Sequence, residues 1–128
     1  MNIAIVCAAL LGLLLFGLGF NVSMQRRQNR RSIGHDASPL DPLHRAVRAH
    51  ANTAEYAPFF AVLFLWYATR PAPAWILVTI VLATIARFAL AGALLFGPSL
   101  NRPNPARFLG ALFTYICGLA LAAGLLVT

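Results

Sequence analysis

Long stretches of chain without a charged residue constrain this protein more than any other feature. The first of them, residues 3–22, contains 20 residues and no acidic or basic side chain. An α-helix rises about 1.5 Å per residue, so about 20 residues cross the roughly 30 Å hydrocarbon core of a bilayer. Because the backbone polar groups must be satisfied within such a segment, this run predicts a membrane-spanning helix.

The composition of the whole chain supports the same class of protein. Hydrophobic residues make up 60% of the 128 residues and charged residues 10%, whereas soluble domains carry about 25% charged residues. The net charge of +7 arises from ten arginines that gather at the ends of apolar segments, as in cytoplasmic loops of membrane proteins. We therefore expect contact with the lipid bilayer and no binding of nucleic acid. The two cysteines lack metal-ligand spacing, so no metal site is expected.

Apolar segments recur four times, which predicts an all-α membrane protein with four transmembrane helices in an up-down antiparallel bundle. A single domain, residues 1–128, would contain spans at about residues 3–22, 43–69, 74–96 and 107–128. The connecting loops, residues 23–42 and 97–106, carry half of the arginines, so both are assigned to the cytoplasm. The chain would then be a multi-pass integral membrane protein with both termini on the non-cytoplasmic side.

The second apolar segment begins with a polar stripe. At 100° per residue, a third of the helix circumference would hold His44, Arg45, Arg48, Asn52, Glu55 and Phe59. One interpretation is that Arg45 and Arg48 extend to lipid headgroups at a helix end. Asn52 and Glu55 lie one or two turns deeper and cannot reach as far. Because ionisable groups are costly within a bilayer, the stripe favours a binding site.

Arg87 lies near the middle of the third segment and also requires a partner. Glu55 is the only acidic residue that could reach it, because the other two acids lie in the first loop. We therefore predict a structural ion pair between Glu55 and Arg87, within one subunit or between subunits. The remaining cations of the stripe, with Arg102 and Arg107 at its mouth, would form a positive pocket that suits an anionic ligand from the cytoplasm.

The stripe carries a resemblance to a known family. The string R-A-x-x-N-x-x-E-x-x-P, from Arg48 to Pro58, is similar to the second-helix signature of the MAPEG family, the membrane-associated proteins in eicosanoid and glutathione metabolism. Ala86-Arg87, Pro105-Ala-Arg107 and the plan of four spans are similar as well. The resemblance implies a homotrimer that binds glutathione, as a cosubstrate, between subunits near the cytoplasmic leaflet. A bacterial-type member in the inner membrane is expected.

The resemblance also implies roles for individual residues. Glutathione would contact Arg48, Asn52, Glu55 and Tyr56, and one of its carboxylates would meet Arg26 or Arg27. Arg107 would face the thiol, with Arg102 as a competitor for that role. Lowering a thiol pKa from about 8.5 to about 6.5 requires about 2.7 kcal/mol. One guanidinium at about 4 Å supplies roughly 4 kcal/mol at an effective dielectric constant of 20, so a single Arg suffices.

The implied function is that of a glutathione transferase or peroxidase acting on lipophilic small-molecule electrophiles. The chain departs from its relatives in the third segment, where Phe88-Ala-Leu90 replaces a His-containing stretch and Ala93 and Leu94 stand near the place of a Tyr. A non-catalytic, MAPEG-like binding or scaffold protein is therefore an open alternative. A small four-helix transporter is the third, and the first span argues against it because that span has no acidic residue.

Overall fold

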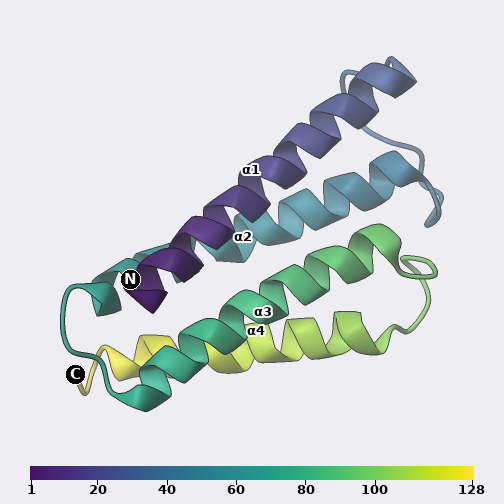
Figure 1. Cartoon of the computed structure of the whole chain (residues 1–128). Coiled ribbons are helices and arrows are strands. Elements are labelled where there is room, and N and C mark those ends of the chain that lie inside the picture. The colour runs from purple at the N-terminus through teal and green to yellow at the C-terminus, as the bar shows by residue number, and fades with distance from the viewer.

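The computed structural model describes residues 1–128 as four helices without a strand: α1 (Ile3–Asn29), α2 (Pro42–Ala68), α3 (Ala74–Phe96) and α4 (Pro105–Gly124). Two antiparallel hairpins, α1 with α2 and α3 with α4, lie side by side and diverge towards the end that carries the two longer connections (Figure 1). Helices α2 and α4 contact each other only sparsely, and α1 does not contact α4. The prediction of an all-α helical bundle is confirmed.

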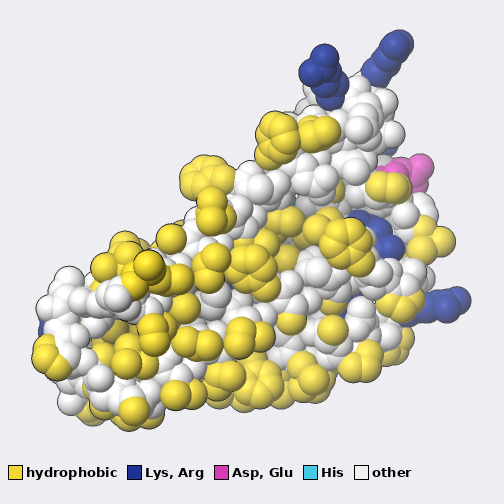
Figure 2. Space-filling model, in the orientation of Figure 1, with side chains coloured by type: hydrophobic (Ala, Val, Ile, Leu, Met, Phe, Trp, Pro, Cys, Tyr) yellow, Lys and Arg dark blue, Asp and Glu magenta, His cyan; other side chains and the backbone are white.

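Three helices, α1, α3 and α4, are long and apolar enough to cross a membrane. The sequence predicted four such spans, and α2 is the one that does not qualify. Its 27 residues match the length of α1, but its first half carries the polar stripe, which lowers its apolar character. Hydrophobic side chains nevertheless cover much of the face shown in Figure 2, and most of the arginines visible there stand at one end. The protein is therefore an integral membrane protein with three candidate spans.

Helix α1 is longer than the apolar run that predicts it. It continues to Asn29, so Arg26 and Arg27 lie in its last turn and not in a loop. Basic side chains are favourable there because the C-terminal end of a helix carries partial negative charge. The helix ends at Arg30, which adopts a left-handed conformation with φ 50° and donates its N–H to the carbonyl oxygens of Arg26 and Arg27. Polar residues of the predicted loop thus extend the helix beyond the expected membrane span.

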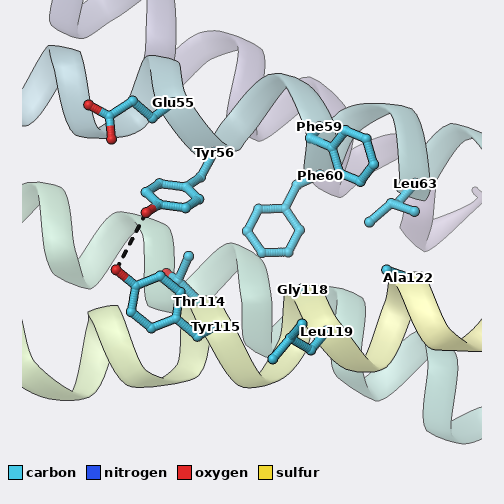
Figure 3. Close-up of a pocket in the computed structure, with 10 residues that line it drawn as sticks. All are labelled: Glu55, Tyr56, Phe59, Phe60, Leu63, Thr114, Tyr115, Gly118, Leu119 and Ala122. Atoms are coloured by element: carbon cyan, nitrogen blue, oxygen red, sulfur yellow. Dashed lines mark hydrogen bonds between the residues drawn. The ribbon is translucent and has the colours of Figure 1, made fainter.

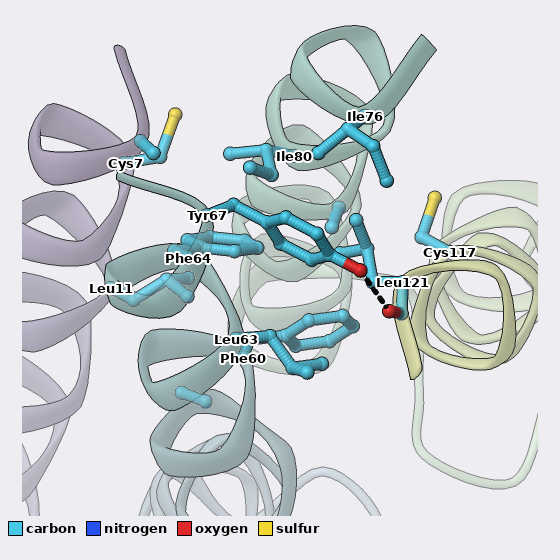
Figure 4. Close-up of a cluster of buried hydrophobic side chains, with 13 residues drawn as sticks. Cys7, Leu11, Phe60, Leu63, Phe64, Tyr67, Ile76, Ile80, Cys117 and Leu121 are labelled. Carbon is cyan, nitrogen blue, oxygen red and sulfur yellow. Dashed lines mark hydrogen bonds between the residues drawn. The ribbon is translucent and has the colours of Figure 1, made fainter. Parts of the chain in front are cut away.

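A hydrophobic core joins all four helices towards the end opposite the arginines (Figure 4). At its centre the Tyr67 hydroxyl donates to the carbonyl oxygen of Leu121 at 2.6 Å, which ties α2 to α4. Gly124 permits this approach, since a Cβ atom at that position would lie 2.6 Å from the same hydroxyl. The Asn2 amide donates to the carbonyl oxygen of Ala68 at 3.1 Å. The helices are therefore fastened at this end, and they separate towards the other.

Candidate functional site

Arg87 is the centre of the polar site. Its side chain is 0% exposed, although it projects from the middle of the apolar helix α3. One guanidinium nitrogen, Nη2, donates to Asn52 Oδ1 of α2 at 2.5 Å, and the other, Nη1, donates to Thr114 Oγ1 of α4 at 3.3 Å. The ring centroid of Tyr56 lies 5.2 Å from Arg87 Cζ, within range of a cation–π contact. One cation therefore links three helices.

The hydrogen bonds of Arg87 fix the orientation of its partners. The Thr114 hydroxyl donates its single proton to the carbonyl oxygen of Gly110 at 2.7 Å, so it meets Arg87 as an acceptor. The Asn52 oxygen is likewise occupied by Arg87, which leaves the Asn52 NH₂ group as the free end of the amide. Asn52 therefore has its hydrogen-bond donors available to a ligand on its open side.

The charge of Arg87 is not balanced by a carboxylate hydrogen-bonded to it. Its Nε atom is buried without a partner, and its two hydrogen-bond partners are both neutral. The expected partner, Glu55, is exposed, and its carboxylate is directed away from the Tyr56 ring (Figure 3). Within one subunit, Arg87 is therefore bonded to Asn52 and Thr114, and not to Glu55 as the predicted ion pair requires. The pairing of Glu55 with a cation of a neighbouring subunit stays a prediction.

Arg45 belongs to the polar stripe of α2, but its side chain bonds to the end of α3 and is not free for a ligand. Its Nε donates to the carbonyl oxygen of Leu94 at 2.9 Å, and its Nη2 donates to the carbonyl oxygen of Gly97. These carbonyl groups belong to the last turn of α3 and to the residue that follows it. Because the C-terminal carbonyl groups of a helix lack partners within that helix, a cation there satisfies them and balances the helix dipole. Arg45 is a structural cap, and Arg48, which is exposed, remains free for a ligand.

The arginines expected near the thiol lie at the start of α4. Arg107 is half-buried and donates to the carbonyl oxygen of Leu100 at 2.5 Å, so its guanidinium holds the linker before α4. Arg102 is exposed, and both arginines line a hollow of about 650 Å³ whose other residues belong to the same linker and helix. Neither Arg48 nor Asn52 lines this hollow. Of the two α1 arginines, Arg26 donates to the carbonyl oxygen of Gly34 at 2.7 Å and Arg27 is exposed.

A groove lies between α2 and α4 (Figure 3). Two of its lining residues, Tyr56 and Thr114, are contacted by Arg87. The groove has a volume of about 570 Å³, and its walls are mostly apolar: Glu55, Tyr56, Phe59, Phe60, Leu63, Thr114, Tyr115, Gly118, Leu119 and Ala122. At one end the Tyr56 and Tyr115 hydroxyl oxygens lie 3.4 Å apart, and the two rings meet edge to face. The groove therefore joins a polar end to a long apolar wall.

Sequence reasoning included Tyr56 but missed Thr114 and Tyr115. The signal was present, because these two adjacent residues are the polar side chains within an otherwise apolar stretch of α4. Their partners could not be read from the sequence, since Arg87 is 27 residues from Thr114 and Tyr56 is 59 residues from Tyr115. Of the predicted site residues, Asn52, Tyr56 and Arg87 are brought together, because Arg87 donates to Asn52 and lies over the Tyr56 ring.

The fold and this site define an integral membrane helical protein with a buried cation and a polar face on its second helix. The model of the MAPEG family matches residues 4–127, so nearly the whole chain is covered. The chain belongs to the MAPEG family, and the expected membership is confirmed. This places it among membrane proteins related to glutathione. No curated protein and no solved structure matches the chain.

Proposed function

We propose that the protein is a glutathione transferase or peroxidase acting on lipophilic electrophiles. The observation that carries the proposal is the Asn52 amide, which Arg87 orients with its donors outwards between Arg48 and Glu55 of the same helix. Glutathione carries two carboxylates and one ammonium group. Arg48 and the Asn52 amide suit a carboxylate, and Glu55 suits the ammonium group. These side chains, with Tyr56, would form the part of the site that α2 contributes.

The site would be completed by a second subunit of a homotrimer. Arg48 and Glu55 lie exposed on a helix within a membrane protein, where unpaired charges are costly. A neighbouring copy would cover them, bring Arg26 or Arg27 to a glutathione carboxylate, and provide a cation for Glu55. In this arrangement α2 crosses the bilayer beside α1, the arginine-rich end faces the cytoplasm, and both termini lie on the other side of the bacterial inner membrane.

The chemical role assigned to Arg107, with Arg102 beside it, is to stabilise the glutathione thiolate. A guanidinium about 4 Å from the sulfur would contribute roughly 4 kcal/mol at an effective dielectric constant of 20, which exceeds the roughly 2.7 kcal/mol needed to ionise the thiol near neutral pH. Arg107 donates from Nη1 to the Leu100 carbonyl oxygen, and the other N–H groups of its guanidinium would make this contact. The thiolate then attacks the electrophilic carbon of a transferase substrate, and a C–S bond forms as the leaving group departs with the electron pair of its bond to that carbon. With a peroxidase substrate it attacks a peroxide oxygen, which breaks the O–O bond, releases the alcohol after protonation and leaves glutathione sulfenic acid. A second glutathione converts the sulfenic acid to the disulfide and water.

The proposal is tested by glutathione conjugation with 1-chloro-2,4-dinitrobenzene on the purified assembly. Arg107→Ala should reduce kcat/KM at least tenfold, and the loss should shrink as the pH rises and the thiol ionises unaided. Arg70→Ala is the matched control, because Arg70 lies at the opposite end of the bundle, stacked 3.7 Å from the Trp66 ring. Absence of activity, or equal activity of Arg107→Ala and the native protein, would contradict the assignment.

A second candidate is a binding or scaffold protein of the same family without catalysis. It is favoured by the bond from Arg107 Nη1 to the Leu100 carbonyl oxygen, which gives the guanidinium assigned to the thiol a structural role in the linker before α4. Calorimetry distinguishes the two functions. Glutathione binding without conjugation or peroxide reduction would support the binding protein, whereas turnover that depends on Arg107 would support the enzyme.

A further inference from the structure

We propose that the arginine-rich end of α1 binds the phosphate headgroup of an anionic phospholipid, whose acyl chains lie along the outer face of the same helix. The headgroup would meet Arg27 and Arg31, and the chains would cover Phe16 and Phe20. This site requires neither glutathione nor turnover, so it goes beyond the proposed function. Of the two α1 arginines considered for glutathione, it uses Arg27 and leaves Arg26.

One face of α1 changes from apolar to basic where the apolar run ends. Phe16 and Phe20 are 77% and 68% exposed, and Leu13 and Met24 are exposed as well. At 100° per residue these four side chains and Arg27 lie within an arc of roughly 80°. In Figure 2 bulky hydrophobic side chains stand along the outer edge of α1, and arginines project from its end. A lipid chain that lies against this face therefore ends at a guanidinium.

Arg27 lies at the depth of the lipid headgroups. The apolar run covers residues 3–22, and Arg27 follows five residues later on the same helix, which corresponds to roughly 7.5 Å. A bilayer of roughly 40–45 Å with a hydrocarbon core of about 30 Å leaves roughly 5–8 Å of headgroup region on each side. The continuation of α1 past its apolar run therefore carries the Arg27 side chain to the level of the phosphates.

The chain turns back after α1 and keeps Arg31 near the same level. The Arg31 N–H donates to the carbonyl oxygen of Arg26 at 3.0 Å. Gly34 adopts a positive φ of 73°, and its carbonyl oxygen accepts a hydrogen bond from Arg26 Nη1 at 2.7 Å. Residues 31–34 are thus held within reach of the last turn of α1. Ile33 is 82% exposed in this segment, which suits an apolar side chain that enters the membrane interface.

The acids of the same loop do not compete for these arginines. The Asp36 carboxylate accepts the N–H of Ser38 at 2.9 Å, and the Asp41 carboxylate accepts the N–H of His44 at 2.9 Å. Arg27 and Arg31 are exposed and available to an external anion. A guanidinium suits a phosphate because its N–H groups can donate two parallel hydrogen bonds. Free phosphate has the same head chemistry, but only a lipid also covers the apolar face of α1.

The test compares phosphatidylglycerol and phosphatidylcholine with identical acyl chains, one of which carries a fluorophore, on the purified assembly in nonionic detergent. Fluorescence anisotropy should give an apparent affinity at least tenfold higher for phosphatidylglycerol, because each arginine near an anionic lipid contributes about a fivefold gain in binding. The preference should decrease in about 0.5 M NaCl, since exposed charges are screened. Inorganic phosphate at about 10 mM should not displace the lipid, because it lacks the chains that cover Phe16 and Phe20.

Variants separate the charge from the apolar face. The double variant Arg27→Gln/Arg31→Gln should lower the preference for phosphatidylglycerol to about twofold or less. Arg27→Lys/Arg31→Lys keeps both charges and should retain most of the preference. Phe20→Ala should weaken the binding of both lipids alike. Arg70→Gln is the matched control, because it removes an exposed arginine from the opposite end of the bundle and should leave the preference unchanged.

Three results would each overturn the proposal: equal affinity of the native protein for the two lipids, an unchanged preference in the glutamine double variant, or an equal loss in Arg70→Gln. Displacement of the lipid by inorganic phosphate would assign the arginines to a soluble anion and would overturn it as well. The measurements contain no glutathione and no electrophile, so they are independent of the conjugation assay that tests the proposed enzyme.

Discussion

At the scale of single residues, the polar site depends on one cation whose partners are neutral. A buried guanidinium without a carboxylate costs free energy, which is reduced but not removed by the bonds to Asn52 and Thr114. Because the burial of this charge does not favour folding, we expect Arg87 to contribute to function more than to stability. Arg87 contacts no open surface itself, so its effect on a ligand must pass through the side chains that it orients.

The variant Arg87→Met separates these two contributions. Removing the cation also removes its desolvation cost, so the unfolding midpoint in detergent should change little or rise. Glutathione affinity, measured by calorimetry, should fall about tenfold because the Asn52 amide loses its fixed orientation, and tenfold corresponds to about 1.4 kcal/mol. Asn52→Ala is the comparison variant and should lose a similar amount of affinity. Unchanged affinity in Arg87→Met would show that the orientation of the amide is irrelevant.

At the scale of helices, caps decide where each element ends and which side chains remain for binding. Asp41 accepts the N–H of His44 at 2.9 Å and starts α2 together with Pro42. Arg45, one turn along that helix, closes α3 by donating to two of its terminal carbonyl groups. The same stripe of α2 thus divides its arginines between capping and the proposed ligand site. The division follows from the distance of each residue from the end of α3.

Arg45→Met should therefore destabilise the protein, while Arg48→Met should not. Hydrogen bonds to charged groups contribute about 1.5–3 kcal/mol, and Arg45 makes two at a helix end. We expect a loss of about 2 kcal/mol in the free energy of unfolding, measured by titration with sodium dodecyl sulfate in mixed micelles. An exposed substitution such as Arg48→Met usually changes this value by less than about 0.5 kcal/mol. Equal losses in the two variants would refute the capping role.

At the scale of the whole molecule, the single chain leaves charges on a helix that its fold does not cover. Arg48 and Glu55 are exposed on α2. The two hairpins diverge towards the end of the bundle at which α2 begins (Figure 1). An apolar environment penalises such charges, so an assembly that pairs them is favoured over the isolated chain. The proposed homotrimer meets this requirement.

Chemical cross-linking of the protein in detergent checks the assembly. The expected product is a trimer whose yield increases with glutathione, because the ligand would bind between subunits and stabilise the assembled form. Glu55→Gln should lower the yield, since it removes the carboxylate that would pair with a cation of the neighbouring copy. A monomer at every protein concentration, with or without glutathione, would refute both the trimer and the shared site.

The sequence by itself determined the class of the protein and the positions of its helices. Apolar length, together with breaks at Pro71, Pro73 and the segment 97–106, is a local property, and local properties can be read along the chain. It also marked Arg87 as a residue that needs a partner. The extension of α1 to Asn29 could not be predicted in this way, because the apolar run of the first segment ends before the helix does.

Only the tertiary structure decided which partners these residues obtain. Glu55 was the expected partner of Arg87 because of its opposite charge. The packing of α2, α3 and α4 instead brings Asn52 and Thr114 to Arg87. The packing also directs Arg45 to the end of α3 and sets Tyr115 against Tyr56. These pairings join residues 27 to 59 positions apart. They depend on how the helices are rotated and spaced against one another, which no local pattern of residues specifies.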